Sequence, residues 1–133
     1  MLSVYTLEKK EEWDTIVRSF VDYDIYYLSG YVKAFQLHGD GEPLLFYYKD
    51  ASIAKFEAFA GKLKEENYFD FSTPYGYGGW LVEGENLEPL FKQYETWCRK
   101  NKIVSEFVRF HPVIKNYVTF EKEYDIVALG NTV

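Results

Sequence analysis

The segment Gly39-Asp40-Gly41-Glu42-Pro43-Leu44-Leu45-Phe46-Tyr47-Tyr48-Lys49 decides how this chain folds. Its first five residues form a turn cluster, because glycine, aspartate and proline interrupt regular structure. Leu44 to Tyr48 is the longest uninterrupted apolar run in the sequence. A run of this length after a turn predicts a buried strand from Leu44 to Lys49. A membrane-spanning helix needs about 20 such residues, so no membrane span is expected.

Two helices are predicted before this strand. The first follows a short strand at Val4–Thr6, with Thr6 as its N-cap. Its apolar residues recur with helical spacing and form one stripe. These residues are Trp13, Ile16, Val17, Phe20 and Val21. A second, shorter helix is predicted to begin at its cap Ser29 and to end at Gly39, since glycine commonly terminates helices.

The segment after the central strand, Ala51–Leu63, fits two patterns. Ile53, Phe56, Ala60 and Leu63 have helical spacing, but apolar and polar residues also alternate as in a strand. Gly61 would weaken a helix end, and a hairpin with Leu44–Lys49 is the natural connection. A strand is therefore the favoured interpretation.

The rest of the chain predicts further strands and one helix. The helix runs from about Leu87 to Asn101, with Asn86 as its cap and Cys98 on its buried face. The extended segments are Phe69–Thr73, Trp80–Val82, Ile103–Phe110 and Tyr124–Leu129. This order predicts a single α/β (α+β) domain over residues 1–133, with helices over a mixed, mostly antiparallel sheet. The same order of elements occurs in the GNAT (acyl-CoA N-acyltransferase) fold.

Composition narrows the functional classes. The net charge of −6 makes nucleic acid an unlikely partner of the whole surface, because phosphate backbones are repelled. Aromatic residues make up 20% of the chain, which indicates either a core built from rings or a tyrosine-lined cleft. The single cysteine excludes an intrachain disulfide and suits a cytoplasmic location, and the N-terminus has no secretory-signal pattern. Two histidines far apart show no metal-ligand spacing, and no metal is expected.

Three segments resemble the N-terminal half of Fem-type proteins, the peptidoglycan bridge-forming aminoacyltransferases, and their GNAT relatives. They are Asp70-Phe71-Ser72-Thr73-Pro74-Tyr75-Gly76-Tyr77-Gly78-Gly79, Val104 to Pro112 followed by Asn116, and Gly41 to Tyr48. The resemblance covers most of the chain and is weakest across Ala51–Leu63. It implies a GNAT-like fold.

The resemblance also implies a role. Fem-type enzymes carry two GNAT-like domains and transfer an amino acid from aminoacyl-tRNA to the peptide of a cell-wall precursor. This chain would supply the first, acceptor-side domain, and a second GNAT-like domain would be its partner. The strand-like ending Tyr124 to Val133, which has neither a closing helix nor a polar tail, agrees with a fragment. The isolated chain would then be inactive and would hold no cofactor. The alternatives are a self-sufficient acetyl-CoA-dependent N-acetyltransferase and a non-catalytic partner-binding domain.

The glycine-rich loop is the first candidate for binding a small-molecule or peptide acceptor. Its residues are Tyr75, Gly76, Tyr77, Gly78 and Gly79. It departs from the usual coenzyme A loop, because no Gln or Arg precedes it at the right spacing and an extended segment follows it. Three interpretations stay open: a structural turn, an acceptor site in which Tyr75 and Tyr77 stack on a sugar or peptide, and a coenzyme A site.

Arg109 and His111 are the second candidates. Two residues apart on a predicted strand, they share a face with Phe107. Arginine can clamp a phosphate or carboxylate with two hydrogen bonds, and histidine can accept a proton near neutral pH. Each also has a structural interpretation, as an ion-paired arginine and as a histidine bonded to a backbone carbonyl. Glu106 is predicted on the opposite face. The residues do not assign a catalytic group.

Overall fold

The central strand is the one that the apolar run predicts. The structure, a computed structural model, describes residues 2–39, 41–49, 53–62, 69–73, 78–83 and 88–109. Within them, β2 (Glu42–Lys49) pairs along its whole length with β3 (Ile53–Lys62) in an antiparallel hairpin. The strand interpretation of the ambiguous segment is therefore confirmed. On its other side β2 pairs antiparallel with β1 (Leu2–Tyr5).

The sheet is mixed and mostly antiparallel, as predicted. β4 (Phe69–Ser72) and β5 (Leu81–Glu83) both pair antiparallel with β3, and β6 (Ile103–Phe107) pairs parallel with β4. The strand order is β1-β2-β3-β4-β6, with β5 on β3 beside this path. A parallel pair needs a crossover connection, and α3 (Glu88–Lys100) lies in that connection. The chain is therefore a mixed α/β protein.

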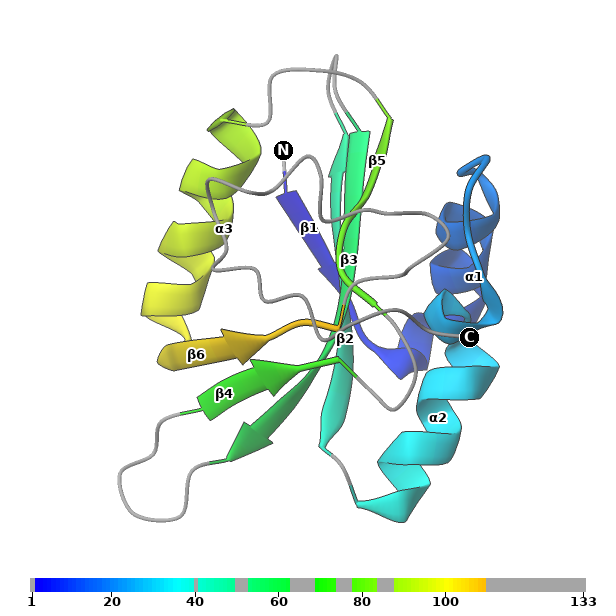
Figure 1. The fold of residues 1–133 in the computed structure, drawn as a ribbon, viewed down its shortest axis with the longest axis horizontal. Helices are drawn as coiled ribbons and strands as arrows, with labels where there is room; N and C mark the ends of the chain where they lie inside the picture. The colour runs from blue at the N-terminus through cyan, green and yellow to red at the C-terminus, as the bar shows by residue number, and fades with distance from the viewer. Residues whose placement is uncertain are drawn as a thin grey trace, which may run out of the picture.

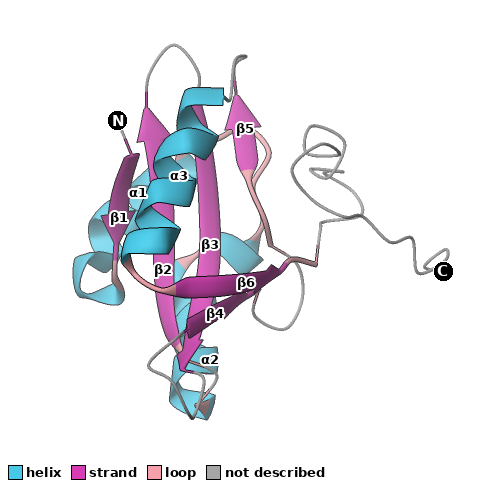
Figure 2. Cartoon of the chain, turned by 90° about the vertical axis from the view of Figure 1, so that its left-hand side faces the viewer, coloured by secondary structure: helices cyan, strands magenta, loops and turns pink. Residues whose placement is uncertain are grey.

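Helices cover both faces of this sheet. Figure 1 shows α3 on one side, and α1 (Lys10–Arg18) with α2 (Ser29–His38) on the other. Figure 2, turned by 90°, shows α3 in front of the strands and α1 behind them. Short 3-10 turns precede both of the latter helices, at Leu7–Lys9 and at Ile25–Tyr27. The result is a three-layer arrangement of helix, sheet and helices.

Each face of the sheet has its own core, because alternate residues of a strand point to opposite sides. Phe46 and Tyr48 of β2 pack under α3, whereas Leu45 packs under α1 and α2. The α3-side core consists of Phe46, Tyr48, Phe71, Trp80, Leu90 and Tyr94. The α1/α2-side core consists of Trp13, Val17, Phe20, Tyr27, Val32, Leu45 and Leu81. A strand covered on both faces explains the continuous apolar run in the sequence.

Helix α1 is shorter than its apolar stripe predicts. It ends at Arg18, so Val21 lies beyond the helix and its side chain is 85% exposed. Thr6 makes no side-chain cap; the chain enters through a 3-10 turn instead. Trp13, Val17 and Phe20 are buried as predicted. The indole Nε1 of Trp13 donates to the backbone carbonyl of Tyr27 at 2.8 Å, which fixes the connector between the two helices.

Helix α2 begins differently from the prediction and ends as predicted. Leu28 occupies the N-cap position, and Ser29 is the first helical residue. Ser29 donates from its backbone N and its Oγ to the two carboxylate oxygens of Asp14, at 2.8 and 2.7 Å. A carboxylate from α1 therefore caps α2, because its negative charge suits the positive end of the helix. Gly39 ends the helix in the left-handed region, at φ +97°.

Candidate functional site: the break in the sheet

The side of β3 that faces β4 and β5 is interrupted. β4 pairs with β3 through Phe59–Lys62, and β5 pairs with it through Ile53–Lys55. Positions 56–58 of β3 lie between the two pairings and belong to neither. β4 and β5 thus pair with the same side of β3, and the glycine-rich loop lies between them in the sequence.

The break coincides with the carboxyl ends of the parallel pair. Ser72 at the end of β4 is paired with Phe107 at the end of β6. The pairing also contains an irregularity between Phe69 and Asp70. In open α/β sheets, ligands bind in the crevice outside the carboxyl ends of the strands. We call the described residues that meet here the sheet break: Thr73, Gly78, Gly79, Phe107 and Arg109.

Thr73 connects the ends of the two parallel strands. Its backbone N donates to the carbonyl of Phe107 at 3.1 Å, and its Oγ1 accepts from the backbone N of Arg109 at 3.1 Å. These two bonds extend the β4–β6 ladder beyond both strands. They hold the backbone of Arg109 next to the start of the glycine-rich loop.

The glycine-rich loop returns to the sheet directly against Arg109. The backbone N of Gly78 donates to the carbonyl of Arg109 at 2.8 Å. Gly78 and Gly79 are both buried, and Gly79 has φ +100°, a conformation that favours glycine. The next residue, Trp80, is fully buried, and its ring contacts those of Tyr94 and Phe91 on α3. Aromatic packing therefore anchors the loop where β5 begins.

The structure brings three of the predicted site residues together: Gly78, Gly79 and Arg109. The backbone of Arg109 is fixed from both sides, while its side chain is exposed. Phe107, 63% exposed, lies beside it at the end of β6. The other predicted site residues, Tyr75, Gly76, Tyr77 and His111, lie outside the described residues.

Sequence reasoning missed the part that Thr73 plays. The residue was predicted as the last of a strand, but β4 ends at Ser72 and Thr73 turns its hydroxyl toward Arg109. A hydroxyl residue directly before Pro74 at a strand end is the only local signal. The partner lies 36 residues away, so the sequence alone could not supply it.

On the α3 side of β6, the surroundings keep a thiol neutral. Burial is the main cause that raises the pKa of Cys98 to about 11, and the charges of Glu106 and Glu95 add to the shift. A hydrogen bond with Tyr94 acts in the opposite direction. Glu106 is half-buried and lies near enough to Cys98 for its charge to act on the thiol. A thiol with so high a pKa is a poor nucleophile near neutral pH.

Two searches of the described part of the chain gave negative results. It contains no group of three His, Cys, Asp or Glu side chains that could hold a metal ion. None of its helices combines the length and the apolar character that crossing a membrane requires.

Comparison with known proteins adds one distant likeness. No family model matches the sequence, and no curated protein matches it. The chain is similar to the crystal structure of a possible acetyltransferase from Clostridium difficile 630, with 15% identity and a TM-score of 0.42. The match covers 100% of this chain and 98% of that chain. A TM-score this low carries no argument about function, so the candidate site stands on its own geometry.

Proposed function

We propose that this chain is a GNAT-like domain of an acyl- or aminoacyltransferase that acts on an amine. The observation that carries the proposal is the sheet break at the carboxyl ends of the parallel strands β4 and β6. The order β1-α1-α2-β2-β3-β4, followed by α3 and β6, is the order that the GNAT resemblance implies, with β5 as an addition. Acyl transfer needs a donor and an amine held together, and a break between two strands offers such a place.

The acceptor side of such a reaction is the role that we assign to this domain. The resemblance to Fem-type proteins suggests a cell-wall precursor as the acceptor, and a second GNAT-like domain as the holder of the donor. Under this proposal the isolated chain binds the acceptor but does not catalyse the transfer reaction. A charge of −6 disfavours docking of an aminoacyl-tRNA on this domain, so the donor would contact the partner domain.

The glycine-rich loop supports an acceptor site better than a coenzyme A site. A pyrophosphate cradle needs backbone N–H groups at a helix N-terminus. Here the N–H of Gly78 already donates to the carbonyl of Arg109, and Gly79 leads into strand β5. Helix α3 begins only at Glu88. The described part of the loop thus offers the wrong secondary structure for the phosphates of coenzyme A.

Arg109 is the residue that we assign to acceptor binding. A guanidinium group forms paired hydrogen bonds with a phosphate or carboxylate, and cell-wall precursors carry both groups. Arg109 donates its backbone N–H to Thr73 and accepts the N–H of Gly78 at its carbonyl, and these two bonds fix where the arginine backbone lies. The exposed side chain extends from that fixed point. A fixed backbone lowers the entropy lost when the side chain binds an anion.

A thermal-shift titration tests the proposal. The chain is heated with a UDP-linked muropeptide and, separately, with acetyl-CoA. A ligand present at 100 times its Kd stabilises the folded state by about 2.7 kcal/mol, which raises Tm by several degrees. We expect a shift with the muropeptide only. Arg109→Ala should abolish the shift, and Arg99→Ala, which removes an exposed arginine from the end of α3, should keep it.

The other outcomes decide against this proposal. A shift with acetyl-CoA alone, with turnover by the isolated chain, would identify a self-sufficient N-acetyltransferase. A stable dimer in light scattering, with no shift from either compound, would identify a non-catalytic partner-binding domain.

In a full-length enzyme, Arg109→Ala should lower kcat/KM by at least about tenfold, or about 1.4 kcal/mol. Unchanged kinetics in a folded variant would remove the assigned role of Arg109.

A further inference from the structure

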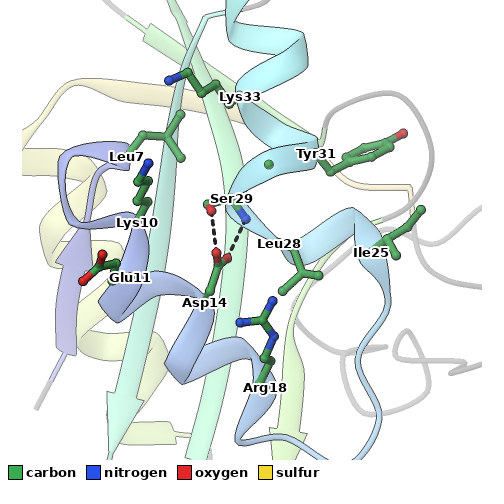
Figure 3. Close-up of a pocket in the computed structure, with 11 residues that line it drawn as sticks. Leu7, Lys10, Glu11, Asp14, Arg18, Ile25, Leu28, Ser29, Tyr31 and Lys33 are labelled. Carbon is green, nitrogen blue, oxygen red and sulfur yellow. Dashed lines mark hydrogen bonds between the residues drawn. The ribbon is translucent and has the colours of Figure 1, made fainter.

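A pocket of about 600 Å³ lies away from the sheet break, between α1 and the start of α2. Figure 3 shows its walls: Lys10 and Arg18 from α1, Lys33 from α2, and Ile25 and Leu28 from the connector. Small-molecule sites commonly have volumes of ~300–1,000 Å³. The size of this pocket suits a small molecule, and none of its walls belongs to the sheet break.

Three cationic side chains line this pocket in a protein that is acidic overall. They are Lys10, Arg18 and Lys33, and all three are exposed. Within the described residues an ion pair joins Lys92 to Glu88 on α3, whereas these three cations form none. With a net charge of −6, unpaired cations that gather at one pocket make a local positive site.

One of the two carboxylates in the pocket is already occupied. Both oxygens of Asp14 accept hydrogen bonds from Ser29, as the dashed lines in Figure 3 show. These bonds join α1 to the start of α2. The carboxylate of Glu11 lies on the same helix and is the only other acidic group among the residues that line the pocket. Positive side chains therefore outnumber negative ones there.

The remaining walls are apolar. Leu7, Ile25, Leu28 and Tyr31 line the pocket, and the side chain of Ile25 is 58% exposed. An apolar ligand body placed on these side chains would be removed from water, which favours binding in proportion to the buried area. Cations beside an apolar wall match a ligand with an anionic group on an apolar body.

We propose that the α1–α2 pocket binds a small amphipathic organic anion, with its acidic group on Arg18 and its apolar body on Leu28 and Ile25. The shared chemistry is a carboxylate joined to an apolar group of moderate size. This proposal is independent of the transferase proposal, because it uses different elements and would stand if Arg109 bound nothing.

Isothermal titration calorimetry with 4-phenylbutyrate tests this pocket. The matched ligand control is 4-phenylbutyramide, which has the same shape without the charge. We expect saturable binding of the carboxylate, and at least about tenfold weaker binding of the amide, or about 1.4 kcal/mol. Equal affinity for the two ligands, or no saturable heat with millimolar carboxylate, would overturn the proposal.

Charge variants locate the binding. Arg18→Gln should weaken carboxylate binding by at least about fivefold, whereas Glu11→Gln should strengthen it by about twofold, because a repelling charge is removed. Lys92→Gln on α3 changes the net charge by the same amount as Arg18→Gln and should leave the affinity unchanged. Circular dichroism checks that each variant is folded, and Arg18→Met, which also removes the charge, replaces Arg18→Gln if the latter is not. An equal loss in Lys92→Gln would show that the binding follows net charge and not this pocket.

Discussion

The cores on the two faces of the sheet are held together by different sets of interactions, although β2 contributes buried side chains to both. On the α3 side, aromatic rings pack against one another. The ring of Phe46 contacts those of Phe71, Tyr94 and Trp97, with centroid separations of 5.7, 5.1 and 4.8 Å. All three pairs meet edge to face, an arrangement that the charge distribution of aromatic rings favours. The high aromatic content thus serves a core in this part of the chain, which is one of the two interpretations that the sequence offered.

On the α1/α2 side, single hydrogen bonds between distant residues supplement the packing. Trp13 donates to Tyr27, Ser29 donates to Asp14, and the backbone N of Val21 donates to Glu83 of β5 at 2.8 Å. Each bond fixes one part of the connector between α1 and α2. The comparison teaches that contacts between rings dominate the core on one face, whereas several hydrogen bonds between distant residues supplement the buried core on the other. The two faces should therefore respond differently to substitution.

The largest effect is expected on the α3 side. Phe46→Ala removes a fully buried ring and its contacts with three others, so it should lower the free energy of unfolding by about 3–5 kcal/mol. Urea denaturation measures this loss. Phe46→Leu keeps most of the apolar area and should cost less than half as much. If both variants lose the same amount, the ring geometry and not the buried area dominates this core.

The same substitution on opposite faces sharpens the comparison. Trp13→Phe keeps a ring but removes the buried donor to the carbonyl of Tyr27, so it should cost about 1–3 kcal/mol. Trp97→Phe on the α3 side removes an indole that makes ring contacts, and should cost less than about 1.5 kcal/mol. Urea denaturation of both variants provides the measurement. An equal cost would show that the buried hydrogen bond of Trp13 contributes nothing beyond packing.

The link between the two helices should contribute a smaller amount. Asp14→Ala leaves the backbone N and Oγ of Ser29 without their acceptors, which should cost about 0.5–2 kcal/mol, the usual effect of losing a cap. Amide hydrogen exchange at Ser29 should become faster in the same variant. Glu11→Ala, which removes an exposed carboxylate from the same helix, should change stability by less than about 0.5 kcal/mol. Unchanged exchange at Ser29 would mean that the carboxylate does not hold the start of α2.

An effect that appears only at high pH concerns the single cysteine on the α3 side. Burial raises the pKa of Cys98 from 9.0 to about 11, so the folded state favours the neutral thiol. The stability that this preference contributes is complete below a pH of about 9 and is lost as the pH rises through about 11. Cys98→Ser, which does not titrate there, should lose less stability than the parent over that interval. Alkylation by iodoacetamide should also show a pH midpoint near the raised pKa. A midpoint near 9 would show that the thiol is solvated.

Local patterns predicted most of the fold. The run Leu44 to Tyr48, the alternation in Ala51–Leu63 and the glycine at the end of α2 depend on near neighbours, and all three predictions are confirmed. The predicted start of α2 was wrong. A serine before a helix is a local capping signal, but here the hydroxyl of Ser29 donates to Asp14, which lies 15 residues away in the sequence. The predicted end of α1 was wrong for a similar reason. Val21 fits the apolar stripe of the helix, but its backbone N donates a hydrogen bond to the distant side chain of Glu83.

The sequence predicted which residues belong to the candidate site, but it did not predict how they contact one another. Glycine and arginine signals identified Gly78, Gly79 and Arg109, but their contact depends on β6 returning beside β4 through α3. The placement of β4 and β5 on the same side of β3 gave no sequence signal, since strand pairing depends on residues far apart in the chain. The α1–α2 pocket was missed because its cations look like ordinary solvated helix residues in the sequence.

Side chains alternate between the two faces along β2, and this alternation restricts the insertions and deletions that the strand can accept. Leu45 and Phe46 are adjacent, both are fully buried, and they serve cores on opposite sides of the sheet. A one-residue insertion or deletion just before Leu45 would move the later side chains of this strand to the opposite core. Rings would then lie under α1 and α2, and Leu45 would lie under the aromatic residues of α3. β2 should therefore accept conservative changes of residue type yet tolerate no change in length.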